Sequence, residues 1–208
     1  DNVWTNYVRG VMLQLQNKGF KFEGFNCVFS STIPVGSGLS SSAALECGFL
    51  FGVKELYNLD IKPVDVALMG QSAEHWVGIN CGIMDQFSSV MGLENKVIKI
   101  DCRTLEYEYH NADFNEYSLI LFDSNVKHSL MTSAYNQRRE QCEEGIAILK
   151  SNFPEVKSFR DCTEEQVQSV KDKMSEDVFK RSLFVVKEIK RVIQACQALD
   201  NGDIQTSG

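Results

Sequence analysis

The sequence has no unbroken apolar run that approaches the ~18 residues typical of a membrane-spanning helix. Its first ten residues, DNVWTNYVRG, also lack the basic and then apolar plan of a signal peptide. Positive charge is in deficit, with 21 Lys and Arg against 28 Asp and Glu, which argues against a broad surface for nucleic acid or anionic membranes. We therefore expect a globular, cytoplasmic chain that binds neither nucleic acid nor membrane, and any phosphate it binds must be held locally.

Close pairs of metal-ligating residues are missing as well. The seven cysteines include no C-x-x-C pair, and the three histidines, His75, His110 and His128, lie far apart in the chain. An odd, scattered set of cysteines fits neither a disulfide framework nor a zinc site. We interpret the cysteines as reduced, mostly buried thiols and assign no metal role to the histidines.

The periodicity of apolar residues predicts strands and helices in the first half of the chain and mainly helices in the second. Strands are expected over residues 25–32, 96–102 and 117–124, and helices over residues 4–17, 43–57, 63–78, 130–150 and 175–199, with short helices that begin at Gly82 and at Thr163. The segment YSLILFDS, residues 117–124, is apolar almost throughout, which favours a central strand. No internal repeat or long linker is evident. We place a domain boundary near residues 112–116, which gives a first domain of residues 1–113 and a second of residues 114–208.

The stretch IPVGSGLSSSAALE, residues 33–46, sits between a predicted strand and a predicted helix. The order of strand, glycine loop and helix places a phosphate at the helix N-terminus, where free backbone N–H groups converge. No lysine follows the glycines as in a P-loop, so a metal ion would need a serine and a distant carboxylate, and Glu74 and Asp85 are the available acids. Each of these features also has a simpler structural explanation. The loop would be an ordinary helix cap, Glu74 a solvated helix residue, and Asp85 a partner of the helix dipole. Tyr135, further along the chain, would be a half-buried aromatic residue.

The motif PVGSGLSSSAALE resembles the phosphate loop of the GHMP small-molecule kinases. The segments CGIMDQF, IDCRTLE, DSNVKHSL and AYNQRREQCE are similar to those of the galactokinase branch of that family. This resemblance implies an α/β (α+β) GHMP kinase fold, with a ribosomal-protein-S5-like N-terminal domain followed by the start of a ferredoxin-like C-terminal domain. The nucleotide and the sugar would bind in the cleft between the two domains.

The same resemblance implies transfer of the ATP γ-phosphoryl group to the anomeric hydroxyl of galactose, which gives galactose 1-phosphate. Matching motif to motif, Ser42 would bind Mg²⁺ together with Glu74, and Asp85 would be the base on the sugar hydroxyl. Gly82 and Tyr135 would line the sugar pocket. The ATP phosphates would be cradled by Gly36, Ser37, Gly38, Leu39, Ser40, Ser41 and Ser42.

The chain departs from the family pattern in two ways. The segment from Glu74 to Asp85 is one residue shorter than expected. The family's opening segment, an Arg followed by a G-E-H-x-D-Y-like turn, would precede Asp1, and its glycine-rich third motif would follow Gly208. We therefore interpret the chain as the central part of a longer, monomeric enzyme, and expect these 208 residues alone to be inactive and to self-associate.

Two other functions stay open at this point. The first is an N-acetylgalactosamine kinase, because residues that read the sugar hydroxyls belong largely to the opening segment. The second is a non-catalytic sensor that binds galactose and ATP to control transcription. In such sensors the phosphate loop lacks a Ser-Ala pair, and the presence of Ser42-Ala43 here favours a kinase.

Overall fold

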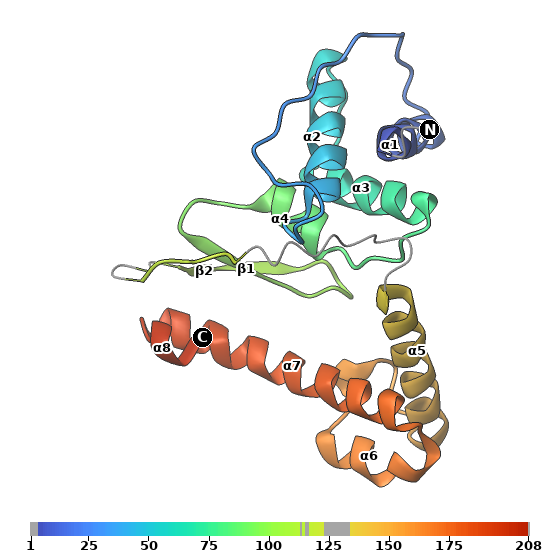
Figure 1. Ribbon diagram of the computed structural model, residues 1–208, viewed down its shortest axis with the longest axis vertical. Helices are drawn as coiled ribbons and strands as arrows, with labels where there is room; N and C mark the ends of the chain where they lie inside the picture. The colour runs from blue at the N-terminus through green and yellow to red at the C-terminus, as the bar shows by residue number, and fades with distance from the viewer. Residues whose placement is uncertain (1–3, 113, 115–116, 123–133, 208) are drawn as a thin grey trace. The chain divides into compact units, whose positions relative to one another are not determined.

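The computed structural model describes residues 4–112, 114, 117–122 and 134–207 (Figure 1). Contacts divide the chain into two compact units. The first contains residues 1–108 and 117–132, and the second contains residues 109–116 and 133–208.

The helices of the first unit are α1 (Thr5–Asn17), α2 (Ser41–Leu56), α3 (Pro63–Val77) and α4 (Met84–Met91) (Figure 1). Helix α3 packs against the other three. Its contact with α1 is close, because a Cβ added at Gly10 would lie only 3.0 Å from the Cβ of Ala73. The core of this unit is built from fully buried residues of α1 and α2 such as Val11, Leu15 and Leu50.

The predicted helices in this unit are confirmed, with the predicted ends within two residues of the observed ones, and the physical reasons for the boundaries are visible. Helix α3 begins at Pro63, whose missing N–H costs nothing at a first helical position. It ends at Gly78, which has a φ of 101° that residues with a Cβ rarely adopt. Helix α1 likewise ends just before Gly19, with a φ of 83°.

The second unit is helical around α7 (Glu176–Asp200). Helices α5 (Ala134–Asn152), α6 (Glu164–Ser169) and α8 (Ile204–Ser207) pack against α7, and the single turns η2 (Phe159–Asp161) and η3 (Lys171–Lys173) flank α6. The predicted capping box at the start of α6 is present, since the Thr163 side chain accepts a hydrogen bond from the Gln166 N–H and the Gln166 side chain accepts one from the Thr163 N–H. Leu149 and Val167 are fully buried in the core of this unit.

The strand predictions were less successful. Strand β1 (Lys96–Ile100) is confirmed, and it pairs with β2 (Tyr107–Asn111), which the sequence analysis missed. The predicted strands over residues 25–32 and 117–124 are wrong for the residues described, because 25–32 and 117–122 are irregular and pair with no described strand. The expected central strand is instead exposed, with Leu119 80% and Phe122 89% accessible. Apolar composition alone cannot make a strand, since a strand requires a hydrogen-bonded neighbour.

All seven cysteines are free thiols, as predicted. The expectation that most are buried is wrong: only Cys47 and Cys196 are buried, and Cys27 and Cys102 are exposed. His75 and His110 belong to different units, and His128 lies outside the described residues. Within the part of the chain that the structure describes, no helix has the length and apolarity needed to cross a membrane.

Candidate active site

The glycine-serine loop leads directly into α2. Gly36 and Gly38 adopt left-handed conformations with φ of 75° and 80°, and Ser40 precedes the helix with a φ of 58°. An added Cβ at either glycine would meet no atom within 4 Å, so the loop is open on that side. Ser37 closes the turn by donating from its hydroxyl to the Pro34 carbonyl at 2.8 Å. The N–H groups of the first turn of α2 have no acceptors within the helix, as at any helix N-terminus.

Ser42, in the first turn of α2, meets Glu74 in the last turn of α3. The Ser42 hydroxyl donates to Glu74 Oε1 at 2.8 Å, although the two residues are 32 positions apart in the chain. Glu74 is only 4% exposed, which excludes the alternative of a solvated helix residue. The structure therefore brings together two of the residues that the sequence analysis grouped in one site.

Two further donors reach the other oxygen of Glu74. Gln86 Nε2 donates to Glu74 Oε2 at 2.5 Å, and the Cys81 thiol donates to the same oxygen at 3.3 Å. Burial, together with the negative charge of Glu74, raises the pKa of the Cys81 thiol to about 12, so this thiol keeps its proton at neutral pH. Both oxygens of Glu74 are thus held by side chains from other parts of the unit.

A second buried acid, Glu46, completes the cluster and was missed by the sequence analysis. It lies one turn after Ser42 on α2, is fully buried, and accepts a hydrogen bond from Gln86 Nε2 at 3.2 Å. Burial and the nearby charge of Glu74 raise the pKa of Glu46 to about 9, so it is a neutral acid at pH 7. A glutamate within an otherwise apolar helix face was the sequence signal that could have revealed it.

The remaining predicted site residues are placed separately. Asp85 lies half-buried in the first turn of α4, directly before Gln86, and Gly82 lies exposed in the loop before this helix. Tyr135 is in the first turn of α5, in the other unit, and its side chain is outside the described part of the structure.

The donor set fits a magnesium ion. Ser42 and Glu74 offer hard oxygen ligands beside a helix N-terminus, and Mg²⁺ commonly uses one or two protein oxygens together with phosphate oxygens and water. No group of three or more His, Cys, Asp and Glu side chains suited to a metal occurs among the described residues, so an all-protein metal cage is not observed there.

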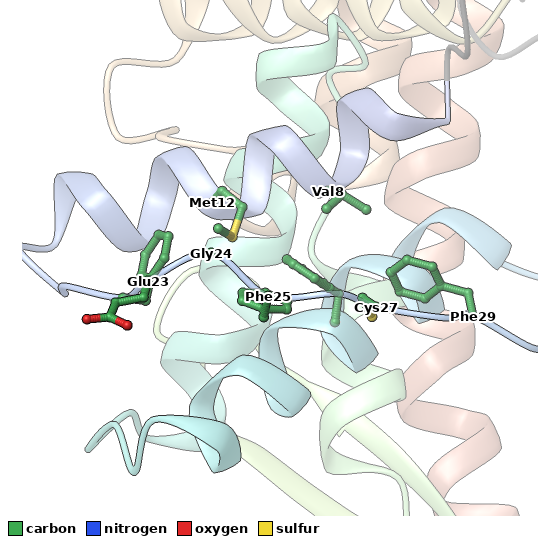
Figure 2. A pocket seen from close by; sticks show the side chains of 9 residues that line it. Val8, Met12, Glu23, Gly24, Phe25, Cys27 and Phe29 are labelled. Atoms are coloured by element: carbon green, nitrogen blue, oxygen red, sulfur yellow. The ribbon is translucent and has the colours of Figure 1, made fainter.

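A cavity elsewhere in the first unit is not part of this site. It has a volume of about 350 Å³ and lies between α1 and the extended segment before the glycine-serine loop (Figure 2). None of the predicted site residues lines it. Its walls are mainly apolar and are formed by Val8, Met12, Phe22, Glu23, Gly24, Phe25, Cys27, Phe29 and Phe49.

The neutral state of Glu46 gives a prediction for stability. Because its folded-state pKa is raised, the folded protein holds the proton more tightly than the unfolded chain, and stability falls as pH rises from about 4.5 to about 9. Glu46→Gln removes this titration. We expect the variant to gain stability relative to the unsubstituted protein as pH rises through that window, by on the order of a few kcal/mol at pH 8.

Urea denaturation at pH 5, 7 and 9 measures this difference. Glu94→Gln, which removes an exposed carboxylate, controls for the change in net charge. A stability difference for Glu46→Gln that does not grow with pH would show that Glu46 is ionised in the folded protein.

Comparison with known proteins shows which proteins the chain is similar to. Residues 6–93 match the family described as the GHMP kinases N terminal domain. Over 208 residues, all of this chain and 57% of the relative, the chain is 39% identical to a galactokinase of Thermotoga maritima. A galactokinase of Limosilactobacillus fermentum is 37% identical over 211 residues, which cover all of this chain and 54% of the relative.

A solved structure agrees with these sequence matches. The crystal structure of Lactococcus lactis galactokinase complexed with galactose matches with a TM-score of 0.93 at 30% identity, covering all of this chain and 54% of that one. The chain thus spans a little over half the length of these relatives. Its fold is the GHMP kinase fold, as predicted, residues 6–93 match the GHMP kinases N terminal domain, and the chain is similar to galactokinases along its whole length.

Proposed function

We propose that the protein containing this chain transfers the γ-phosphoryl group of ATP to the anomeric hydroxyl of galactose. The observation that carries this proposal is the contact between Ser42 and Glu74, which gives the open glycine-serine loop an acidic metal-binding partner at the start of α2. Whole-length similarity to galactokinases supports galactose as the substrate. The reaction is cytoplasmic in this proposal.

The loop and the start of α2 bind the ATP phosphates. Left-handed backbone at Gly36 and Gly38 turns the chain so that its N–H groups, with those of the first turn of α2, can face an anion. Ser37, Leu39, Ser40 and Ser41 belong to the same phosphate-binding loop. Ser42 and Glu74 would hold Mg²⁺, and the ion would neutralise charge on the transferring phosphate.

Asp85 acts on the sugar. Its carboxylate accepts a hydrogen bond from the anomeric hydroxyl, orients that oxygen toward the γ-phosphorus and takes its proton as the new P–O bond forms. The bond from the γ-phosphorus to the bridging oxygen breaks, and ADP leaves with the electron pair. Gly82, which has no side chain, leaves room beside Asp85 for the sugar ring, and Tyr135 is a further sugar-binding residue in this proposal.

The left-handed glycines make the phosphate loop sensitive to substitution. Gly38→Val places a branched side chain on a backbone with a φ of 80°, which costs about 1–2 kcal/mol even though the space is open. We expect the loop to change conformation and the affinity for ATP to fall about 10-fold, while α2 and the core stay folded.

Titration with a fluorescent ATP analogue measures this affinity. Gly202→Val is the matched control, because Gly202 also has a positive φ of 71° and open space but lies after α7. Equal nucleotide affinities for Gly38→Val and the unsubstituted protein would favour the simple helix-cap interpretation of the loop.

The proposed function is tested on the natural protein that contains this chain, by measuring ADP release with galactose, with N-acetylgalactosamine and without sugar. We expect galactose to stimulate ADP release at least 10-fold more than N-acetylgalactosamine. Preference for N-acetylgalactosamine would reassign the substrate. Binding of galactose and ATP without turnover would identify a sensor, and the absence of binding would refute the proposal.

A further inference from the structure

Gln86 joins three helices through one amide group. Its Nε2 atom donates to Glu74 on α3 and to Glu46 on α2, while Gln86 itself lies on α4, next to Asp85. The side chain is fully buried. It is also tightly packed, because a Cβ added at Gly70 would lie 3.1 Å from Gln86 Cγ.

This arrangement fixes the orientation of Glu74. An unconstrained glutamate side chain rotates about three torsions, and a metal ligand gains affinity when neighbouring groups hold its carboxylate in one orientation. With Gln86 on Oε2, the other oxygen is directed to Ser42.

We propose that Gln86 is a positioning residue, which holds the Glu74 carboxylate toward Ser42 and links this pair to the helix that carries Asp85. The inference rests on the proposed function only in its catalytic consequence. Its structural content, the orientation of Glu74 for a divalent cation, can be measured without turnover.

Glu46 is the second acceptor of the Gln86 amide, and its protonation state is consistent with the positioning role of Gln86. If Glu46 were ionised, two buried negative charges would compete for one neutral amide, and burial would oppose this state. Within the described residues, Glu46 Oε1 and Gln86 Oε1 have no hydrogen-bond partner. A proton on the Glu46 carboxyl supplies a donor in a cluster that otherwise has a surplus of acceptors, in agreement with its raised pKa.

The test replaces Gln86 with methionine, which has a similar length and no hydrogen-bonding amide. The probe is Mn²⁺, titrated by electron paramagnetic resonance into the natural protein saturated with a non-hydrolysable ATP analogue. We expect Gln86→Met to weaken Mn²⁺ binding about 10- to 100-fold, the range typical for loss of a group that orients a metal ligand. The Mg²⁺ concentration for half-maximal turnover should rise in parallel, with the KM for galactose unchanged.

Gln71→Met is the matched control. Gln71 lies on α3 and donates a hydrogen bond from its amide to the Cys81 carbonyl at 3.2 Å. We expect Mn²⁺ affinity within 2-fold of the unsubstituted protein for this variant. Equal weakening by both substitutions, or unchanged Mn²⁺ affinity in folded Gln86→Met, would overturn the proposal.

A double variant covers the case in which Gln86→Met does not fold. Glu46→Gln with Gln86→Met removes the second acid together with the amide, so Glu74 is then the one carboxylate of the cluster that loses the donor from Gln86. We expect this variant to fold and to keep the loss of Mn²⁺ affinity, whereas Glu46→Gln alone retains normal binding. Normal Mn²⁺ binding in the folded double variant would contradict the positioning role of Gln86. A natural protein that binds Mn²⁺ as expected but phosphorylates no sugar would refute only the proposed function.

Discussion

Asp85→Asn is expected to lower kcat for galactose phosphorylation by about 10²- to 10⁴-fold, the usual contribution of a general base. Asparagine keeps the shape of the side chain and can still accept a hydrogen bond from the sugar hydroxyl. It cannot take the proton, because its amide is not basic. The affinity for galactose should therefore change little, and the loss should appear in kcat rather than in KM.

Asp65→Asn is the matched control for this variant. Asp65 is also a half-buried aspartate in the first turn of a helix, α3, so its substitution removes the same favourable interaction with a helix dipole. We expect Asp65→Asn to change kcat less than 3-fold. If the two variants lost activity equally, Asp85 would be a dipole partner and not a base.

Glu74→Gln is expected to weaken Mn²⁺ binding to the nucleotide-saturated protein by about 100-fold or more, since a neutral amide is a poor ligand for a hard cation. The geometry adds a structural cost. Both Glu74 oxygens accept hydrogen bonds, from Ser42 on one side and from Gln86 and Cys81 on the other, whereas glutamine has one acceptor oxygen. In the variant, the amide NH₂ of the new glutamine faces a neighbouring donor that has lost its acceptor. This costs about 1–3 kcal/mol, so the melting temperature should also fall.

Glu46→Gln makes the same chemical change in the same buried cluster. Because Glu46 is already neutral at pH 7, its replacement should leave Mn²⁺ affinity within 2-fold of normal. Loss of Mn²⁺ binding in Glu46→Gln but not in Glu74→Gln would mean that the two acids have exchanged roles, and the proposed metal site would be wrong.

The sequence predicted the helices well because their signals are local. Pro63 at the start of α3 and Gly78 after its end act through their own backbone preferences, whatever surrounds them. Strands depend on neighbours that no local pattern reveals. The alternation of β2 was missed, and the apolar segment 117–122 was assigned to a sheet in which it has no described partner.

The candidate site shows the same difference between features with local sequence signals and features that depend on distant residues. The left-handed glycines were predictable from the motif, but no local signal links Ser42 to Glu74 across 32 residues, and their grouping came from resemblance to the GHMP kinases. Glu46 and Gln86 escaped notice because their importance lies in burial and in contact with another acid. Both properties exist only once α2, α3 and α4 are packed together.

The most direct test of the account is a crystal structure of the natural protein with Mn²⁺, a non-hydrolysable ATP analogue and galactose, using anomalous scattering to locate the metal. We predict a manganese peak at bonding distance from Ser42 Oγ and a Glu74 oxygen, with phosphate oxygens completing its coordination. We also predict the Asp85 carboxylate within about 2.6–3.2 Å of the anomeric hydroxyl. A manganese peak away from Ser42 and Glu74, or a sugar whose anomeric hydroxyl lies out of reach of Asp85, would contradict the account.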